Sequence, residues 1–370
     1  MNFEFSEDSR LLRDQARRFL GEHCTSKAVR QVLEGKAPFL RDLWREMAGM
    51  GWLGAAIPEE YEGAGLGHEA LCVLAEELGR ALAPVPFTST ICVAAETILA
   101  AGSEAQKRDL LPRIARGELI ATLAFGAGAG EPAPSRVQAT ARDGRLSGTA
   151  WPVPDGSFAD LAIVAARDGT GVSLFVVDLT GAGVTRASIA MIDPTRDHAR
   201  LTFDQAPATP LGTSGEGWEI VRGVLDRAAI LVAFEQVGGA SVCLETAIAF
   251  AKERHAFGRP IGSFQAIKHK LADVYVATEL ARSNAWYGAW ALSAGAAELP
   301  LAAATARVSA TEAFFLAAKE SVQVHGGIGF TWEMDNHLFY RRAKLLGLSL
   351  GSARHWKDRV VSELETRNAA

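Results

Sequence analysis

The chain has 370 residues, a formal net charge of −5 at pH 7, 48% hydrophobic residues and 22% charged residues. This length predicts two or three packed units, and the composition is that of an ordinary globular protein. The acidic balance argues against a nucleic-acid-binding protein, which is usually basic, and the lack of an uncharged apolar run of eighteen residues argues against a membrane span.

The amino-terminal stretch and the cysteines indicate the cellular compartment. The stretch "MNFEFSEDSRLLRDQ" is too polar and acidic for a signal peptide. The four cysteines lie far apart in apolar surroundings, at positions 24, 72, 92 and 243. Such spacing gives neither a disulfide framework nor a metal site, so we expect buried thiols in a cytoplasmic protein without a bound metal.

Residues 1–118 have the pattern of a helical domain. Ser6 is a candidate N-cap for the first helix, and "FLRDLWREM" (39–47) places apolar residues on one helical face. Ser103 and Gln106 form a capping-box pattern at the start of another helix. The Pro- and Gly-rich stretch 57–67 between them predicts a loop.

Residues 119–215 change to short β-rich runs separated by turns. Asp-Gly pairs at 143–144 and 168–169 lie between alternating segments, which is a strong hairpin signal. Four prolines between 132 and 154 also disfavour helix. These features predict a small antiparallel β domain, a barrel or a sandwich.

Residues 216–370 return to a helical pattern. A stretch of about forty residues from Gly217 is long for a globular helix and typical of a bundle. Further helices are expected near 263–294 and 300–325, and a shorter one from about 335. The sequence therefore predicts a mainly α protein with a central β domain, in the order helical domain, β domain, four-helix bundle.

Common catalytic and nucleotide-binding motifs are absent from the sequence. "GAGAGEP" (126–132) fails the dinucleotide-binding pattern because Glu131 stands where the third glycine is required and Pro132 follows instead of a helix. The chain also lacks the G-x-S-x-G, H-E-x-x-H and P-loop patterns.

The stretch "RHAFGRPIGSFQAIKHKLAD" (254–273) places four basic residues around a predicted turn between two helices. An arginine such as Arg254 suits a pyrophosphate, and the amide of Gln265 suits the edge of a purine. The alternative is a plain helical hairpin with solvated charges.

The stretch "QVHGGIGFTWE" (323–333) ends a helix with three glycines in four positions. Glycine tolerates positive φ, and the exposed backbone N–H groups of such a turn can receive an anion or the edge of a flavin. The alternative is a glycine-rich helix C-cap.

Together the two stretches resemble the acyl-CoA dehydrogenase family, a family of flavoproteins, over essentially the whole chain. The family pattern R-x-x-F-G-x-x-I-x-x-F-Q matches Arg254, Phe257, Gly258, Ile261, Phe264 and Gln265. The pattern Q-x-x-G-G-x-G-F matches Gln323, Gly326, Gly327, Gly329 and Phe330.

The resemblance implies FAD as cofactor and an acyl-CoA thioester as substrate. It implies that a carboxylate removes the α-proton while the β-hydride goes to the flavin. The FAD-binding residues carried over are Arg254, Phe257, Gln265, Gln323, Gly326 and Gly327. The resemblance also implies an oligomer and an electron-transferring flavoprotein as acceptor, in fatty acid or steroid catabolism. It leaves the acyl group unspecified.

Both positions at which the family places its catalytic base lack a carboxylate. The pattern R-D-A-K-x-x-x-I-Y-E-G-T aligns with "RRAKLLGLSLGS", so Leu350 stands in place of the glutamate. The minority position on the long helix falls on Ala228, followed by Ala229 where the family has arginine. Glu235 is a weak candidate for the base, because it lies roughly 10 Å along the helix from Ala228.

The β domain departs from the family pattern as well. The segment "LAFGAGAGEP" aligns with the family's flavin-contacting T-E-P, and Pro154 aligns with a threonine that donates near flavin N5. Proline offers neither hydroxyl nor backbone N–H, and Trp151 in the same segment is expected to be a packing residue.

The motifs that are kept are those that, in family tetramers, hold the FAD of the neighbouring subunit. The contacts that are lost serve a subunit's own flavin. The first hypothesis is therefore a base-lacking subunit of a heteromeric acyl-CoA dehydrogenase. The alternatives are a homotetramer with a non-standard base, a flavin monooxygenase of the same fold, and a non-catalytic protein that binds CoA esters.

Overall fold

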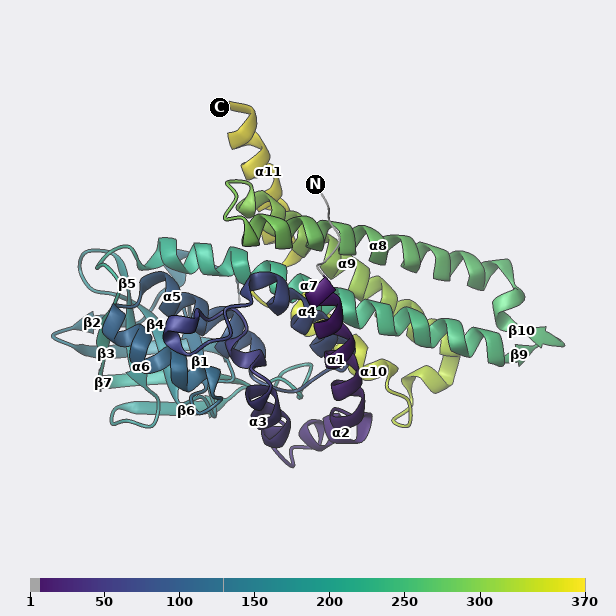
Figure 1. Cartoon of the computed structure of the whole chain (residues 1–370), viewed down its shortest axis with the longest axis horizontal. Coiled ribbons are helices and arrows are strands. Elements are labelled where there is room, and N and C mark those ends of the chain that lie inside the picture. The colour runs from purple at the N-terminus through teal and green to yellow at the C-terminus, as the bar shows by residue number, and fades with distance from the viewer. Residues whose placement is uncertain (1–6, 129, 370) are drawn as a thin grey trace. The chain divides into compact units, whose positions relative to one another are not determined.

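The computed structural model describes residues 7–128 and 130–369; Ser6, the expected N-cap, lies outside them. Its elements follow the predicted order of helices, strands and helices (Figure 1). Two compact units form. One contains Met1–Val29, Cys72–Ala83 and Ala229–Ala370, and the other contains Arg30–Leu71 and Pro84–Ala228. The division into domains at residues 118 and 215 stays a prediction, because spatial packing groups part of the amino-terminal helices with the carboxy-terminal ones.

The amino-terminal third is helical, as predicted. Leu43, Trp44 and Met47 are buried on one face of α3, and Ser103 and Gln106 form the expected capping box of α6. The elements are α1 (Glu7–His23), α2 (Ser26–Leu33), α3 (Arg41–Gly49), the 3₁₀ turns η1 (Trp52–Gly54) and η2 (Glu59–Tyr61), α4 (Gly67–Arg80), the π-helical η3 (Thr88–Ala95), α5 (Glu96–Ala101) and α6 (Glu104–Ala115).

One eight-stranded sheet follows, with β1 (Ala121–Ala124), β2 (Thr140–Arg142), β3 (Arg145–Pro154), β4 (Leu161–Arg167), β5 (Val172–Asp178), β6 (Val184–Ser188), β7 (His198–Pro207) and β8 (Thr209–Leu211). Its strand order is β6-β7-β3-β2-β4-β5-β8, with β1 also paired to β4.

The predicted Asp143-Gly144 hairpin is present between β2 and β3, and both turn residues have positive φ. Most pairings in the sheet are antiparallel, as predicted, but β1 and β2 each run parallel to β4. These strands are not joined to β4 by a tight turn, so no hairpin imposes an antiparallel direction on them.

The carboxy-terminal part is helical, as predicted. Its elements are α7 (Gly217–Glu253), β9 (His255–Ala256), β10 (Arg259–Pro260), η5 (Ile261–Ser263), α8 (Gln265–Ser293), α9 (Leu299–His325), η6 (Gly326–Phe330), α10 (Asn336–Leu346) and α11 (Ala353–Ala369). The sequence pattern predicted a single helix from about residue 335, whereas the structure has two helices there, α10 and α11. Two helical segments, Gly217–Glu253 and Leu299–Phe330, would be long and apolar enough to cross a membrane, but 89% and 56% of their apolar windows are buried in the protein.

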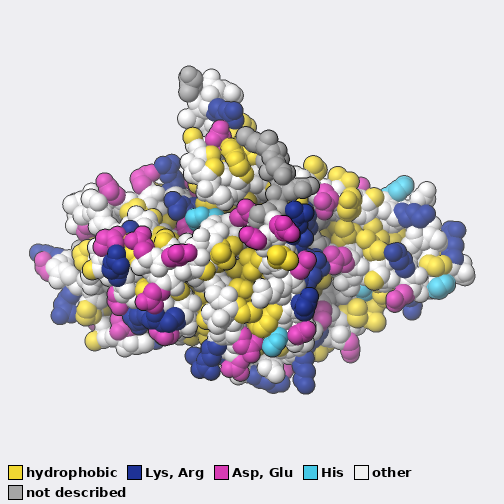
Figure 2. All heavy atoms as spheres, in the orientation of Figure 1, with side chains coloured by type: hydrophobic (Ala, Val, Ile, Leu, Met, Phe, Trp, Pro, Cys, Tyr) yellow, Lys and Arg dark blue, Asp and Glu magenta, His cyan; other side chains and the backbone are white. Residues whose placement is uncertain are grey.

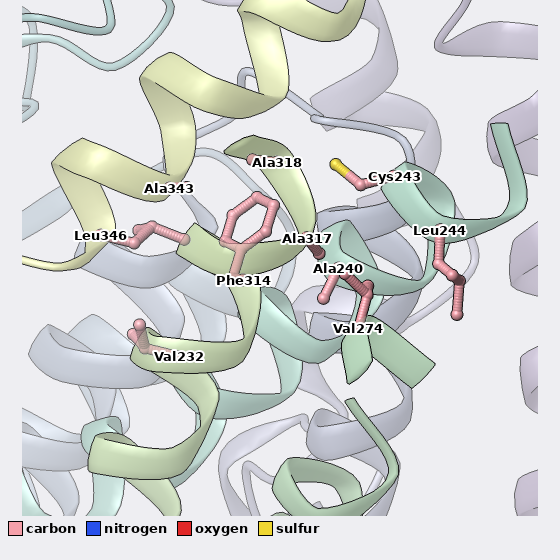
Figure 3. Close-up of a cluster of buried hydrophobic side chains, with 10 residues drawn as sticks. All are labelled: Val232, Ala240, Cys243, Leu244, Val274, Phe314, Ala317, Ala318, Ala343 and Leu346. Atoms are coloured by element: carbon pink, nitrogen blue, oxygen red, sulfur yellow. The ribbon is translucent and has the colours of Figure 1, made fainter. Parts of the chain in front are cut away.

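The core of the first unit lies among α7, α8, α9 and α10. Figure 3 shows its main cluster, in which Leu346 of α10 reaches toward the ring of Phe314 on α9. Helices α4 and α7 cross closely because two glycines lie at their contact. A Cβ at Gly79 would collide with the carbonyl oxygen of Glu235, and one at Gly238 with that of Glu76.

The sequence has 38 Lys and Arg residues and 43 Asp and Glu residues, so the surface carries charges of both signs. On the face drawn in Figure 2, Lys and Arg side chains are interspersed with Asp and Glu. Hydrophobic side chains are also exposed along α8, where Tyr275, Val276 and Leu280 are each more than half exposed.

Candidate functional site

The arginine turn, residues 254–265, joins α7 to α8 through the small hairpin β9–β10. Arg254 and Gln265 are exposed at its two ends. Phe257 has a φ of 54° and is 95% exposed, so the turn presents an aromatic ring to solvent. The guanidinium of Arg259 lies 4.1 Å from the centre of the Phe264 ring, which fixes one basic side chain on the turn itself.

The glycine turn, residues 323–330, ends α9. Gln323, Gly326 and Gly327 are exposed, and a Cβ on either of these two glycines would meet nothing within 4 Å. Gly326 has a φ of 64°, which favours glycine. Gly329 differs, because it is buried and a Cβ there would lie 2.8 Å from the Cβ of His325. The first two glycines therefore leave the backbone open to a ligand, while the third allows close packing.

The two turns meet at one end of the helical bundle. Val324 forms a hydrophobic cluster with Ala247 and Ala251 of α7, and Ile261 of the arginine turn packs against it. The ring of His325 is stacked on that of Phe250 with centroids 4.2 Å apart. Motifs about seventy residues apart in sequence thus come together.

This end of the bundle fits the phosphate-bearing part of FAD. It combines an exposed guanidinium at Arg254 and an exposed amide at Gln265, the first residue of a long helix. The open backbone at Gly326 and Gly327 lies beside them. Such a combination of cation, amide and helix N-terminus can bind an anionic group. No cluster of three or more potential metal ligands occurs among the described residues.

Leu350, at the first position expected for the base, lies in the loop between α10 and α11. Its backbone has a φ of 61°, and its half-buried side chain packs against the core cluster of Figure 3. Its neighbour Gly351 also has positive φ, at 110°. The position therefore presents an aliphatic side chain that is part of the bundle core.

A buried arginine holds this loop. Arg307 of α9 is 1% exposed and donates from Nη2 to the carbonyl oxygen of Ser349 at 2.8 Å and to that of Leu346. Its Nη1 donates to Thr311 Oγ1 at 2.8 Å and to Gln236 Oε1. Burial lowers the pKa of Arg307 to about 10, although the charge of Glu235 acts to raise it. These four hydrogen-bond partners of Arg307 are neutral oxygens. Two of them are the carbonyl oxygens of Leu346 and Ser349, so these hydrogen bonds hold the loop backbone in place.

The second expected position for the base, at Ala228 and Ala229, is fully buried within α7. Glu235, the weak candidate, is 4% exposed, and its Oε1 accepts from Nη1 of Arg342 at 2.9 Å. Arg342 is itself 1% exposed and lies 3.5 Å from the carbonyl oxygen of Leu82. A carboxylate engaged in a buried ion pair is poorly placed to remove a proton from a ligand, so we propose a structural role for Glu235.

In the β domain, Trp151 of β3 is half-buried, and its ring is covered by the guanidinium of Arg200 from β7 at 4.4 Å from the ring centre. Pro154 at the end of β3 contributes only its carbonyl oxygen, which accepts from Thr122 Oγ1 at 2.7 Å. Proline has no hydroxyl, so Pro154 does not offer the threonine donor that the family has beside its flavin.

The sequence prediction missed Arg307, Arg342 and Arg200. Arg342 had a signal, since it stands where the pattern R-D-A-K has aspartate. Arg307 is a basic residue in the largely apolar first half of α9, which is a weak indication of a buried network.

A sequence model described as "Acyl-CoA dehydrogenase, N-terminal domain" matches residues 6–118, and one described as "Acyl-CoA dehydrogenase, C-terminal domain" matches residues 215–360. The chain is 35% identical to Acyl-CoA dehydrogenase IpdE2 of Mycobacterium tuberculosis over 363 residues, which are 97% of this chain and 98% of that protein. It is also 35% identical to Acyl-CoA dehydrogenase FadE34 of the same organism, covering 97% of this chain and 48% of FadE34.

Two solved structures are similar over nearly their full length. A variant of the Tcur3481–Tcur3483 steroid acyl-CoA dehydrogenase has a TM-score of 0.90 and 35% identity, covering 98% of this chain and 99% of the other. The ChsE4–ChsE5 complex from Mycobacterium tuberculosis has a TM-score of 0.90 and 28% identity, covering 99% of both chains.

Proposed function

The chain belongs to the acyl-CoA dehydrogenase family, and from this premise we propose that it is the base-lacking subunit of a heteromeric, FAD-dependent acyl-CoA dehydrogenase. In the proposed complex a homologous chain supplies the catalytic carboxylate for an acyl-CoA thioester. This chain supplies the arginine turn and the glycine turn to the FAD of that homologous chain. The complex is cytoplasmic and passes electrons to an electron-transferring flavoprotein.

The observation that carries this proposal is the contrast between two sets of residues. Arg254, Phe257 and Gln265 are all exposed, as a contact with another chain requires. In contrast, the base positions hold Leu350, which packs against the bundle core, and Ala228, which is fully buried. If one chain of a complex provided the catalytic base and the other provided the two turns, this chain would keep the turns and lose only the base.

Arg254 would hold the pyrophosphate of FAD, and Gln265, Gln323, Gly326 and Gly327 would contact its nucleotide part. When bound, FAD supplies the acceptor for the hydride that leaves the β-carbon of the acyl group. The α-proton needs a positioned base of suitable pKa, and the partner chain would provide it.

The similar structures support the heteromeric arrangement and suggest the substrate. Two of them are named as pairs of chains, Tcur3481–Tcur3483 and ChsE4–ChsE5, and the first is described as a steroid acyl-CoA dehydrogenase. On this basis we propose a CoA thioester with a bulky, steroid-like acyl group.

Two other functions use the same fold. A homotetramer with a non-standard base would need a carboxylate elsewhere in this chain and would bind one FAD per chain. A non-catalytic protein that binds CoA esters would bind no FAD in any assembly.

The deciding measurement is the FAD content per chain, from flavin absorbance against protein mass. Expressed alone, the chain should contain close to no FAD. Co-expressed and co-purified with a homologous dehydrogenase chain, it should contain about one FAD per two chains. One FAD per chain for this protein alone would overturn the proposal in favour of the homotetramer.

A matched pair of substitutions tests the role of the arginine turn. Arg254→Gln should lower the FAD content of the co-purified complex, because it removes the charge that pairs with the pyrophosphate. Lys252→Gln, at an exposed residue of the last turn of α7 two positions before Arg254, should leave it unchanged. Equal FAD contents in the two variants would argue against an FAD contact by this turn.

A further inference from the structure

A cavity of about 350 Å³ lies within the unit that contains the helical bundle. Its walls come from the end of α1, the start of α2, the end of α4, the second half of α7, the end of α9 and the start of α10. It reaches the surface, because Thr246 and Glu333, which line it, are exposed. Its volume lies in the range of small-molecule binding sites.

The wall of this cavity is mostly apolar. Nine of the sixteen lining residues have apolar side chains, among them Val29, Leu82, Val242, Leu338 and Phe339. Leu338 is buried, and Phe339 beside it is partly buried. A ligand that fills the cavity therefore has an apolar body, since burial of apolar surface is the main favourable contribution there.

One buried polar side chain in the wall has an unused acceptor. Asn336, the first residue of α10, is 5% exposed and lines the cavity. Its Nδ2 donates to Ser321 Oγ at 2.8 Å and lies 3.1 Å from Nδ1 of His325. Within the described residues its Oδ1 accepts no hydrogen bond. A ligand that donates a hydrogen bond would satisfy this oxygen.

The charged residues of the wall favour a cation over an anion. Among the described residues that line the cavity, Arg80 is basic, and Glu333 and Asp335 are acidic. The two Nη atoms of Arg80 already donate to the two carboxylate oxygens of Glu245, at 3.0 and 2.7 Å. The charge of the arginine is thus matched by a residue that does not line the cavity, whereas an anion in the cavity would meet two carboxylates.

We propose that this cavity binds an organic ammonium ion, that is, a cation with an apolar body. The body packs against Leu338 and Phe339. The ammonium N–H groups donate to Asn336 Oδ1 and lie near the carboxylates of Glu333 and Asp335. An ammonium group has donors and no acceptor, which complements an amide oxygen and two carboxylates.

This site is distinct from the glycine turn. Ser321 in the wall is buried, whereas Gln323 in the turn is exposed. Two positions along a helix correspond to a rotation of about 200°, so these side chains project from nearly opposite faces of α9. The inference therefore does not depend on the proposed function.

The test is calorimetric titration of the full chain with 2-phenylethylammonium chloride, whose cation has an aromatic body. The matched ligand is 2-phenylethanol, which has the same body and no charge, and sodium chloride holds the ionic strength constant. We expect saturable binding of the ammonium ion. The alcohol should bind about tenfold more weakly or worse, because hydrogen bonds with a charged group are roughly twice as strong as neutral ones.

Substitutions separate the charge of the cavity from its shape. Glu333→Gln and Asp335→Asn should each weaken binding of the ammonium ion about fivefold or more, because each removes a negative charge beside it. Both should leave binding of the alcohol unchanged. Val242→Phe should abolish binding of both ligands, because the larger side chain fills the cavity. Glu365→Gln, at an exposed acid on α11, is the matched control and should bind as the unsubstituted chain does.

Thermal unfolding gives a second readout. The ammonium ion should raise the unfolding temperature, because the cavity exists only in the folded chain. Val242→Phe should lose this rise, and Glu365→Gln should keep it. Equal affinities for the ammonium ion and the alcohol would overturn the proposal. So would binding that does not saturate, or that is unchanged in the Glu333, Asp335 and Val242 variants.

Discussion

Leu350 is constrained through both its backbone and its side chain. Its positive φ is unusual for a residue other than glycine, and its side chain adds to the hydrophobic cluster of the bundle. The leucine that replaces the family glutamate therefore contributes to packing. A carboxylate restored at position 350 would disturb the core.

Leu350→Glu should lower the free energy of unfolding by roughly 2–4 kcal/mol, because it places a charge against apolar side chains. Leu348→Glu in the same loop, where the leucine is 69% exposed, should change it by less than about 0.5 kcal/mol. Urea denaturation of both variants measures the difference. Equal effects would show that residue 350 faces solvent.

The buried pair of Glu235 and Arg342 is the second feature at this scale. Glu235→Gln or Arg342→Gln alone should cost roughly 3–5 kcal/mol of stability, since each removes one member of a buried ion pair. The double variant should cost less than the two single variants combined. Full activity of a complex that contains the folded double variant would support a structural role, whereas complete loss of activity would support Glu235 as the base.

At the scale of elements, the contact between α4 and α7 depends on small residues and charges together. Gly79 and Gly238 let the two helices approach, and the guanidinium of Arg80 pairs with Glu245 at 2.7 Å beside them. The close approach positions two neighbouring residues of α7. Glu235 accepts a hydrogen bond from Arg342, and Gln236 accepts one from Arg307.

Gly79→Ala should cost roughly 1–3 kcal/mol, because the new Cβ collides with the backbone of Glu235. Gly223→Ala is the matched control on α7, where a Cβ meets nothing within 4 Å. It should be neutral or stabilising by up to about 1 kcal/mol, since alanine favours helix. Thermal unfolding distinguishes the two.

A second group of elements is joined by Glu96, the first residue of α5. Its carboxylate is buried and accepts from His68 Nε2 at 2.9 Å and from Arg227 Nη1 at 3.0 Å. Burial acts to raise the pKa of Glu96, but the hydrogen bonds and charges of His68 and Arg227 outweigh it and lower the pKa below the ordinary 4.5. The folded chain then binds fewer protons than the unfolded chain near this pH.

The stabilisation from Glu96 should therefore be complete above about pH 4.5 and be lost as the pH falls through the lowered pKa. Glu96→Gln should reduce the slope of the free energy of unfolding against pH in this acid range. Glu219→Gln, at an exposed ion pair with Arg222, is the matched control. An unchanged slope in both variants would contradict the assignment.

At the scale of the whole molecule, the exposed apolar side chains of α8 indicate a surface that another chain covers. Tyr275, Val276 and Leu280 are 57%, 54% and 60% exposed and lie within six positions of one helix. Exposed apolar patches of this kind commonly mark interfaces between proteins, and an oligomer is also what the proposed contact of the two turns with the FAD of another chain requires.

Leu280→Lys should reduce the mass of the assembly measured by analytical ultracentrifugation, because it places a charge in an apolar contact. Ser283→Lys on the same helix, already polar and exposed, should assemble as the unsubstituted chain does. Assembly unaffected by Leu280→Lys would place the interface elsewhere.

Local signals predicted much of this structure. The capping box of Ser103 and Gln106 and the turn at Asp143-Gly144 involve residues only a few positions apart, so the sequence alone specifies them. The long helix α7 follows from an uninterrupted helical pattern. The family pattern also identified Arg254 and Gly326, whose exposure at the two turns agrees with a ligand contact, although their binding of FAD stays a prediction.

The order of helices and strands, the family and the absence of a glutamate at position 350 all follow from the amino-acid sequence. Which charges pair depends instead on the folded chain. Glu235 meets Arg342 across 107 residues, and Arg307 meets the loop at Ser349 across 42. The fold also placed Arg200 on Trp151 and joined β1 and β2 to β4 in parallel. Local conformation depends on neighbouring residues, whereas these partners are selected by helix crossings and strand registers that exist only once the chain is folded.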